Sequence, residues 1–133
     1  MGRLILDTGV LVSMERGTLQ LGSILSDEDD AVISAITVAE FATGIRLAHT
    51  DIQHDLRQAF LVNLLFVLPV VDYTAEIAER HADLLAHTQR AGRKRGPHDL
   101  IIAATAAATD RVLLTTDAKA GFSELPGVSV RII

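Results

Sequence analysis

The sequence contains no cysteine and no tryptophan, and only 4% of its residues are aromatic. The absence of cysteine excludes disulfide bonds, thiol nucleophiles and thiolate metal sites together. Any metal ion would have to be held by oxygen atoms or imidazole nitrogens. The scarcity of aromatic side chains argues against a protein that binds nucleic acid mainly by stacking on its bases.

The chain also lacks an apolar run long enough to cross a membrane. The longest, residues 59–71, is interrupted by Asn63 and Pro69 and is shorter than the ~20 residues that a bilayer span requires. The N-terminal segment carries one arginine and then Asp7 within its apolar run, which differs from the charged-then-apolar plan of a signal peptide. We therefore expect a cytoplasmic protein that does not interact with membranes.

There is no excess of positive charge. The chain has 12 Lys and Arg against 17 Asp and Glu, which gives a formal net charge of -5 and argues against a protein that binds nucleic acid over its whole surface. Four of these cations nevertheless fall within six positions, at Arg90, Arg93, Lys94 and Arg95. The sequence predicts a local basic patch on an acidic protein, although a solvated turn after a helix explains the cluster equally well when it is taken alone.

A chain of 133 residues, 49% of them hydrophobic, can bury a core of its own, and we expect a single domain over residues 1–133. Short apolar segments typical of strands occur at residues 3–6, 31–34, 66–71, 112–117 and 128–133. Segments typical of helices lie between them, at residues 10–17, 18–25, 38–49, 51–65, 74–91 and 97–108. This alternation predicts an α/β fold, a three-layer sandwich with a mostly parallel central sheet of four to five strands flanked by helices.

Two helix starts carry specific signals. Pro97 fits the first turn of a helix, because its missing N–H costs nothing there. The segment that follows is apolar nearly all round, so we expect it to be the most buried helix. Thr37 and Glu40 have the spacing of a capping box, which predicts a helix that starts near Val38 with Glu40 in its first turn.

Four carboxylates are predicted to face one edge of this sheet. Asp7 and Asp117 directly follow strands, while Glu40 and Asp99 lie in the first turns of helices that start at the same edge. Ligand sites in such folds form beyond the carboxyl ends of the strands. Each acid alone has an ordinary explanation as a residue that favours helix starts and turns. Together they would repel one another, by on the order of 4 kcal/mol for a pair ~4 Å apart at an effective dielectric of ~20, so we expect a cation among them.

Carboxylate oxygens in a protein without cysteine suit Mg²⁺ or Mn²⁺. Mg²⁺ commonly binds through one or two carboxylates together with phosphate oxygens, which favours phosphate chemistry with an activated water as the nucleophile. Arg93, Lys94 and Arg95 lie one turn upstream of Asp99. We expect this cluster to hold the flanking phosphates of a polynucleotide.

The four acids stand in the segments LILDTGVL, ITVAEFATGI, HDLIIAATA and LLTTDAKAGF, in that order along the chain. These segments resemble the four acidic blocks of the PIN-domain ribonucleases. Their order and spacing, and the length of the chain, resemble the VapC toxins of bacterial toxin-antitoxin pairs. The resemblance covers the whole chain.

This resemblance implies an endoribonuclease that depends on Mg²⁺ or Mn²⁺, cuts single-stranded or loop RNA, and leaves a 5′-phosphate and a 3′-hydroxyl. It implies that Asp7 and Asp99 are the principal metal ligands. Glu40 and Asp117 would complete the catalytic site directly or through water, and Thr115 matches a hydroxyl residue that often precedes the last acid by two positions. It further implies a homodimer and a cognate VapB antitoxin whose C-terminal segment blocks the acidic groove.

Other enzymes and signalling domains with acidic pockets fit the sequence less well. A haloacid-dehalogenase-like phosphatase would need an aspartate two positions after Asp7, where this chain has Gly9. A receiver-type signalling domain would need a phosphoacceptor aspartate at the end of its third strand and a late lysine. Only Asp72 and Lys119 stand near those places.

Two further alternatives stay open. His98, beside Asp99, allows metal-free cleavage of RNA through the 2′-hydroxyl by a histidine acid and base, which would leave a 2′,3′-cyclic phosphate. A non-catalytic interaction module could keep the fold and its groove, although the presence of all four acids gives no reason to favour it.

Overall fold

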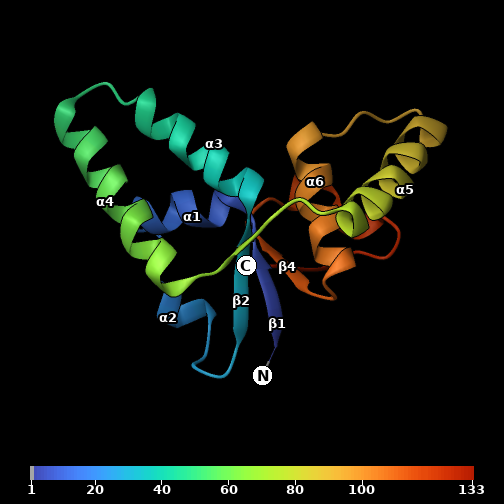
Figure 1. The fold of residues 1–133 in the computed structure, drawn as a ribbon, viewed down its shortest axis with the longest axis horizontal. Helices are drawn as coiled ribbons and strands as arrows, with labels where there is room; N and C mark the ends of the chain where they lie inside the picture. Colours follow the sequence, from blue (N-terminus) through green and yellow to red (C-terminus); the bar gives the residue numbers. More distant parts are fainter. Residues whose placement is uncertain (1) are drawn as a thin grey trace.

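A five-stranded parallel sheet forms the middle layer of the protein (Figure 1), whose computed structural model describes residues 2–133. The strands are β1 (Arg3–Leu6), β2 (Asp30–Ser34), β3 (Val70–Val71), β4 (Val112–Thr115) and β5 (Ser129–Ile132). They lie in the order β3-β2-β1-β4-β5, so β1 is the central strand. The apolar runs of β1 and β4 fit this position, because a central parallel strand is covered on both faces.

Helices cover both faces of the sheet (Figure 1). They are α1 (Thr8–Glu15), α2 (Leu21–Ile24), α3 (Ala35–Arg46), α4 (Asp51–Val67), α5 (Ala75–Ala91) and α6 (Pro97–Ala108), with short 3-10 turns at Ala118–Ala120 and Phe122–Glu124. Leu4 and Leu6 of β1 pack in one core cluster with Phe41 of α3, whereas Ile5 packs in a second cluster with Ile102 of α6. Since successive side chains of a strand point to opposite faces, these two cores confirm the predicted three-layer α/β sandwich.

Helix α6 is the buried helix that the sequence predicts. It spans Pro97–Ala108 as expected, with Gly96 at the N-cap position and Pro97 in the first turn. Its buried residues are Leu100, Ile102, Ala103, Ala104, Thr105 and Ala106. The apolar body therefore anchors the helix in the core while its first turn, which carries Asp99, stays at the edge of the sheet.

The predicted start of α3 is wrong by three residues. The cap is Ser34, whose hydroxyl accepts a hydrogen bond from the Ile36 N–H at 3.3 Å. Thr37 is fully buried inside the helix and does not cap it. Ser34 ends β2 and has a side chain able to cap, so the helix begins directly after the strand. Glu40 consequently lies in the second turn of α3 instead of the first.

The third strand is shorter than predicted, because α4 continues through Val67. Pro69 disfavours helical backbone at the preceding residue, so the helix stops there and only Val70–Val71 pair with β2. The long apolar segment within residues 59–71 is thus mostly helix. Among residues 2–133, no helix combines the length and the apolar character needed to cross a membrane.

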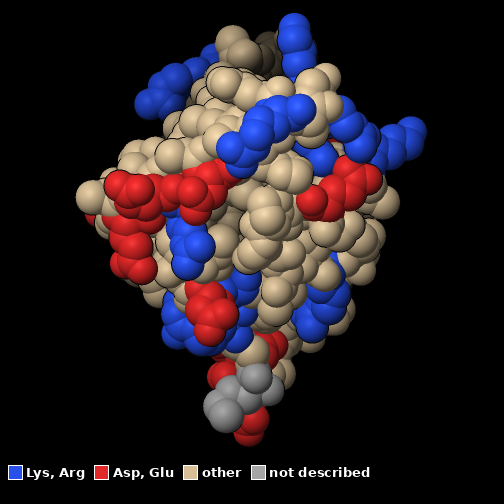
Figure 2. Space-filling model, turned by 90° about the vertical axis from the view of Figure 1, so that its right-hand side faces the viewer, with Lys and Arg blue, Asp and Glu red and all other residues tan. Residues whose placement is uncertain are grey.

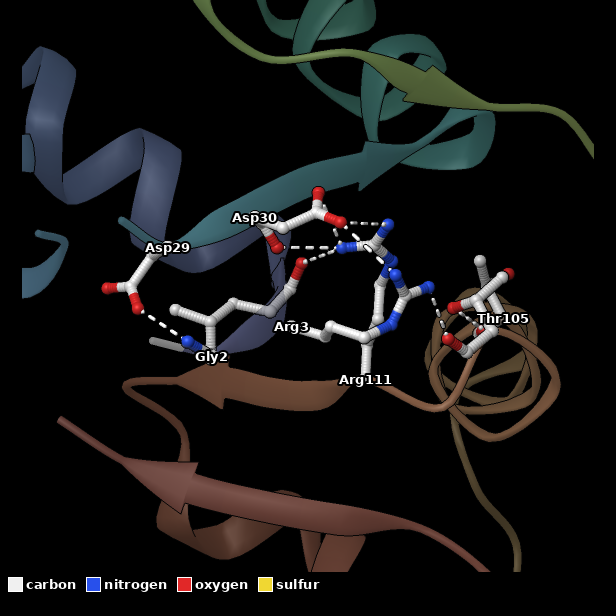
Figure 3. Close-up of polar contacts among 8 residues, drawn as sticks. Gly2, Arg3, Asp29, Asp30, Thr105 and Arg111 are labelled. Atoms are coloured by element: carbon white, nitrogen blue, oxygen red, sulfur yellow. Dashed lines mark hydrogen bonds and ion pairs between the residues drawn. The ribbon is translucent and has the colours of Figure 1, made fainter. Parts of the chain in front are cut away.

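At the amino ends of the strands, two arginines converge on Asp30 (Figure 3). The Arg111 side chain is 8% exposed and pairs with both Asp30 carboxylate oxygens, at 3.1 and 3.3 Å. It also donates to the backbone carbonyl oxygens of Leu4 and Asp30. Arg3 pairs with the same carboxylate at 3.2 Å and donates to the carbonyl oxygen of Thr109. These contacts tie β1, β2 and the start of β4 together at the end opposite the predicted site.

Candidate active site at the carboxyl ends of the strands

Asp7 is a buried carboxylate held at the end of β1. Only 7% of the residue is exposed. Its Oδ1 accepts a hydrogen bond from the Thr8 N–H at 2.9 Å, and its Oδ2 accepts one from the Thr115 hydroxyl at 2.8 Å. Each oxygen keeps further lone-pair capacity, because an ionised carboxylate has about four acceptor positions. Asp7 is therefore fixed in orientation, and its oxygens can still accept further interactions.

Asp99 lies in the first turn of α6, and its carboxylate folds back over Gly96. A Cβ atom at position 96 would stand 2.9 Å from the Asp99 Oδ2, closer than such atoms approach. A larger residue at position 96 would therefore require the Asp99 carboxylate to move, although the backbone conformation of Gly96 is an ordinary one. The positive end of the helix dipole favours the ionised carboxylate at this position.

The two aspartates share an unfavourable electrostatic environment. Burial raises the pKa of Asp7, and the charges of Glu40 and Asp117 raise it further, against the lowering effect of the hydrogen bonds from Thr115 and Thr8. Burial likewise raises the pKa of Asp99, followed by the charges of Asp7, Glu40 and Asp117. The structure therefore brings the four predicted acids close enough to act on one another.

Both carboxylate oxygens of Glu40 already have partners. Oε1 accepts a hydrogen bond from the Thr8 hydroxyl at 2.7 Å, and Oε2 lies 3.3 Å from Nδ1 of His98. The Thr8 hydroxyl also lies 3.1 Å from that of Thr37. The sequence gives no reason to assign Thr8 or Thr37 to the site, and it indicates His98 only as an acid or base of the metal-free alternative. The only signal along the chain was that Thr8 and His98 each adjoin a predicted acid.

Asp117 has a structural role as well as its position at the site. It is exposed, and its Oδ1 accepts hydrogen bonds from the N–H groups of Lys119 and Ala120, both at 3.0 Å. It thereby caps the 3-10 turn that follows β4. The Thr115 hydroxyl accepts a hydrogen bond from the Asp117 N–H at 3.0 Å while donating to Asp7. Thr115 therefore links the two acids at the ends of β1 and β4.

We expect Thr115→Val to destabilise the protein by about 2 kcal/mol, since a hydrogen bond to a charged group contributes about 1.5–3 kcal/mol. Valine has the shape of threonine but cannot donate to the buried Asp7 carboxylate or accept from Asp117. Urea unfolding at pH 7 in EDTA measures the change.

Thr115→Ser keeps the hydroxyl and should restore most of this loss. Thr105→Val is a matched control, because the buried Thr105 hydroxyl donates only to the Ile101 carbonyl oxygen within α6. Equal destabilisation by valine at positions 105 and 115 would contradict a specific role for the contact with Asp7.

The structure separates the three cations predicted to hold RNA. The Arg95 side chain is only 11% exposed, pairs with Glu124 at 2.9 Å and donates to the carbonyl oxygens of Ala120 and Gly121. It therefore ties the loop before α6 to the loop after β4. Arg93 also pairs with Glu124, at 3.2 Å, but its side chain is 67% exposed. Together with the exposed Lys94, it faces solvent.

The donor chemistry of the site fits a hard divalent cation, because it offers carboxylate oxygens, and burial first and then the neighbouring negative charges raise the pKa values of Asp7 and Asp99. Within residues 2–133, no three His, Asp or Glu side chains stand close enough to ligate one ion together. The arrangement thus suits an ion held by one or two carboxylates and completed by water, which is the usual environment of Mg²⁺. Asp7 and Asp99 are the acids with the unfavourable charge that such an ion would offset.

Proteins of known sequence and structure resemble this chain over nearly its full length. "Ribonuclease VapC" of Rickettsia bellii (strain RML369-C) is 27% identical over 127 residues, which cover 96% of this chain and 93% of that protein. A VapBC-5 structure from Mycobacterium tuberculosis, described as a member of the VapBC family of toxin-antitoxin systems, matches with a TM-score of 0.78 and 28% identity, covering 100% of this chain and 98% of that one.

A second structural match concerns the fold alone. VapBC2 from Rickettsia felis, solved bound to a DNA fragment from their promoter, has a TM-score of 0.88 at 22% identity and covers 98% of each chain. The family model described as the PIN domain matches residues 4–128, which include all four acids. The chain therefore belongs to the PIN-domain family.

Proposed function

We propose that this protein is an endoribonuclease that depends on Mg²⁺ or Mn²⁺ and acts as the toxin of a type II toxin-antitoxin pair. The observation that carries the proposal is the meeting of Asp7, Glu40, Asp99 and Asp117 at one edge of the sheet, where the pKa values of Asp7 and Asp99 are raised. The similarity to VapC ribonucleases supports the substrate class and the toxin role.

The four acids have two kinds of role in this proposal. Asp7 and Asp99 would hold the metal ion, and Glu40 and Asp117 would complete the site, from α3 and from the end of β4. Thr115 orients Asp7 through its hydroxyl, so that the carboxylate does not need to reorganise when the ion binds. A bound Mg²⁺ or Mn²⁺ would supply an activated water and stabilise charge on the leaving oxygen, giving a 5′-phosphate and a 3′-hydroxyl.

The exposed cations before α6 would hold the RNA backbone. Arg93 and Lys94 lie a few residues before Asp99, so phosphates flanking the scissile bond can reach them. Figure 2 shows Lys and Arg side chains projecting at the top of the face that carries α5, the end at which α6 begins. Arg95 would act indirectly, by fixing the loop after β4 that carries Asp117.

A hollow beside Glu40 supports the proposal that an antitoxin binds this protein. It lies among α1, α3 and α4, with an apolar wall from Val12 and Phe41 and charged groups from Glu15 and Arg57. Thr8 and Glu40 also line it, so it is continuous with the acidic site. A peptide segment of a VapB-type antitoxin bound there would cover the acids.

The proposed toxin is a homodimer. Large apolar side chains are exposed along α4, at Ile52, Leu56, Val62, Leu65, Phe66 and Val67. Phe66 is 86% exposed. Clusters of this kind are more typical of a protein interface than of a solvated helix.

Incubation of a mixed RNA pool with the protein, with and without Mg²⁺ or Mn²⁺, tests the proposed function. We expect cleavage only with metal, and sequencing of both product ends should find 5′-phosphates and 3′-hydroxyls. The same data identify the preferred cleavage sequence.

Heat-denatured protein carried through the same purification controls for contaminating ribonucleases. A 2′,3′-cyclic phosphate at the cut, or equal cleavage in EDTA, would overturn the metal-dependent mechanism and favour a histidine-based one. Absence of cleavage with either ion, for protein shown to be folded, would overturn the assignment as a ribonuclease.

A further inference from the structure

A hollow of about 580 Å³ lies between the end of α5 and the start of α6. These helices pack side by side (Figure 1), and the loop that joins them carries the exposed Arg93 and Lys94. Pro97 and Leu100 line the hollow from the stretch of α6 that carries Asp99. The hollow therefore adjoins the acidic site, and it shares no described lining residue with the hollow proposed for the antitoxin.

The wall of this hollow is mostly apolar. Leu85 lines it from α5, and Pro97 and Leu100 line it from α6. Leu100 is buried, whereas Leu85 is 39% exposed. A Cβ atom at Gly92, which also lines the hollow, would meet no atom of residues 2–133 within 4 Å. The hollow is therefore open, and a flat apolar group that entered it would remove the exposed surface of Leu85 from water.

The charged side chains that line the hollow within residues 2–133 are all cations, namely Arg93, Lys94 and Arg95. The Arg95 guanidinium is already engaged by Glu124 and two carbonyl oxygens. Arg93 and Lys94 are exposed on a chain whose formal net charge is -5. The hollow thus combines an apolar wall with exposed cations, which suits an apolar group attached to an anion.

A nucleotide is such a ligand, because its flat base is joined through ribose to a charged phosphate. Sites for small molecules measure roughly 300–1,000 Å³, so the hollow has room for one base. Proteins that recognise single-stranded RNA commonly bind its unstacked bases in this way. We infer that the hollow binds one nucleobase of the RNA substrate, with Leu85 against the base and Arg93 and Lys94 beside its phosphate.

The base in the hollow belongs to a neighbour of the reacting phosphate. Asp99 does not line the hollow, although Pro97 and Leu100 on either side of it along the chain do. The hollow and the Asp99 carboxylate therefore lie on different sides of α6, and a helix with its side chains is about 10–12 Å across. The inference rests on the proposed ribonuclease function and adds a subsite through which the enzyme selects among RNA sequences.

Binding in EDTA, which prevents metal-dependent cleavage, tests the inference directly. The probes are fluorescein-labelled strands of equal length and charge: oligoadenylate, oligouridylate, oligocytidylate and a ribose-phosphate strand without bases. We expect the wild-type protein to bind at least one base-containing strand about tenfold or more tightly than the abasic strand, because even one methylene group in an apolar pocket contributes about tenfold. Fluorescence anisotropy measures the four Kd values.

Leu85→Asn replaces the exposed apolar side chain with a polar one of similar size and should abolish most of this preference. Ala82→Asn is the matched control, because Ala82 is exposed on α5 one turn before Leu85 and does not line the hollow. It should bind all four strands as the wild type does. Thermal melting should show both variants folded.

Cleavage provides a second readout. In an RNA that contains the mapped cleavage sequence, single abasic nucleotides replace each of the residues near the cut in turn. At one position we expect the abasic nucleotide to lower kcat/KM of the wild-type protein about tenfold. Leu85→Asn should lower kcat/KM on the intact RNA and lose little more at that position, and this non-additivity is the signature of a direct contact.

The outcomes separate the inference from the ribonuclease assignment. Equal binding of all four strands by the wild-type protein, or a full preference kept by Leu85→Asn, would overturn the inference whether or not the protein cleaves RNA. An equal loss by Leu85→Asn on the base-containing and abasic strands would indicate an effect on the phosphates and would also overturn it. A preference that Leu85→Asn abolishes, in a protein that cleaves no RNA, would support the base site and overturn the proposed nuclease activity.

Discussion

Asp99→Asn should lower metal-dependent RNA cleavage at least about 100-fold and, in EDTA, raise the melting temperature. Loss of activity is expected because even groups that only orient metal ligands contribute 10–100-fold, and Asp99 is proposed to ligate directly. The gain in stability follows from the raised pKa of Asp99, which burial causes first and the charges of Asp7, Glu40 and Asp117 increase. The amide removes this charge and gives up its interaction with the helix dipole, about 0.3–1 kcal/mol, together with its attraction to His98.

The stability difference should depend on pH with a definite sign. Because folding raises the pKa of Asp99, the unfolded chain ionises more readily, and the ionised carboxylate destabilises the fold once the pH exceeds the ordinary carboxyl value of 3.8. The advantage of Asp99→Asn in EDTA should therefore be full at pH 8 and disappear as the pH falls toward that value. Thermal melts across this range measure it.

Adding Mg²⁺ should reverse the order of the melting temperatures of the wild-type protein and Asp99→Asn. Mg²⁺ binds the folded wild-type protein and stabilises it by mass action, whereas the variant has lost a ligand and should gain less. Asp83→Asn, an exposed position on α5, controls for loss of negative charge and should change neither activity nor stability. An Asp99→Asn protein that still cleaves RNA, or that melts markedly lower than the wild type in EDTA, would contradict the assignment of Asp99.

Features that depend on neighbours along the chain could be predicted. The run from Arg3 to Leu6 and the aspartate after it predict a buried strand that ends directly before Asp7, and β1 confirms this. Pro97 predicts the start of α6, because a proline in the first turn and the apolar residues after it are local signals. The shared edge of the four acids follows from strand-helix alternation, which applies to parallel sheets in general.

Features that depend on contacts between distant segments could not be predicted from the sequence. Nothing near Arg95 in the sequence indicates that its guanidinium is covered by the loop at Ala120 and Gly121. The contact of His98 with Glu40 joins two helices on opposite faces of the sheet, so neither residue predicts the other. The start of α3 is not predictable for a different reason, since Ser34 and Thr37 are both able to cap a helix and only the end of β2 decides between them.

Asp30 is another residue whose role depends on contacts between distant segments. Its neighbours in the sequence indicate only a solvated acidic turn. Asp30→Ala should destabilise the protein by about 2 kcal/mol, because it removes the half-exposed carboxylate that pairs with the nearly buried Arg111 guanidinium and leaves that charged donor group without this partner. Arg111, whose side chain is 8% exposed, would lose its carboxylate and keep only carbonyl partners. Its Nε already has no hydrogen-bond partner within residues 2–133. The midpoint of urea unfolding measures the loss.

Two controls separate this effect from the general loss of an acid. Asp27→Ala, at an exposed position before β2, should leave stability unchanged. Arg3→Ala should cost less than about 1 kcal/mol, because Arg3 and Asp30 are both about half exposed and surface pairs contribute little. Since the cluster around Asp30 lies at the amino ends of the strands and the acids lie at the carboxyl ends, folded Asp30→Ala protein at low temperature should retain the RNA cleavage rate of the wild type. Loss of activity without loss of stability would contradict a purely structural role for this cluster.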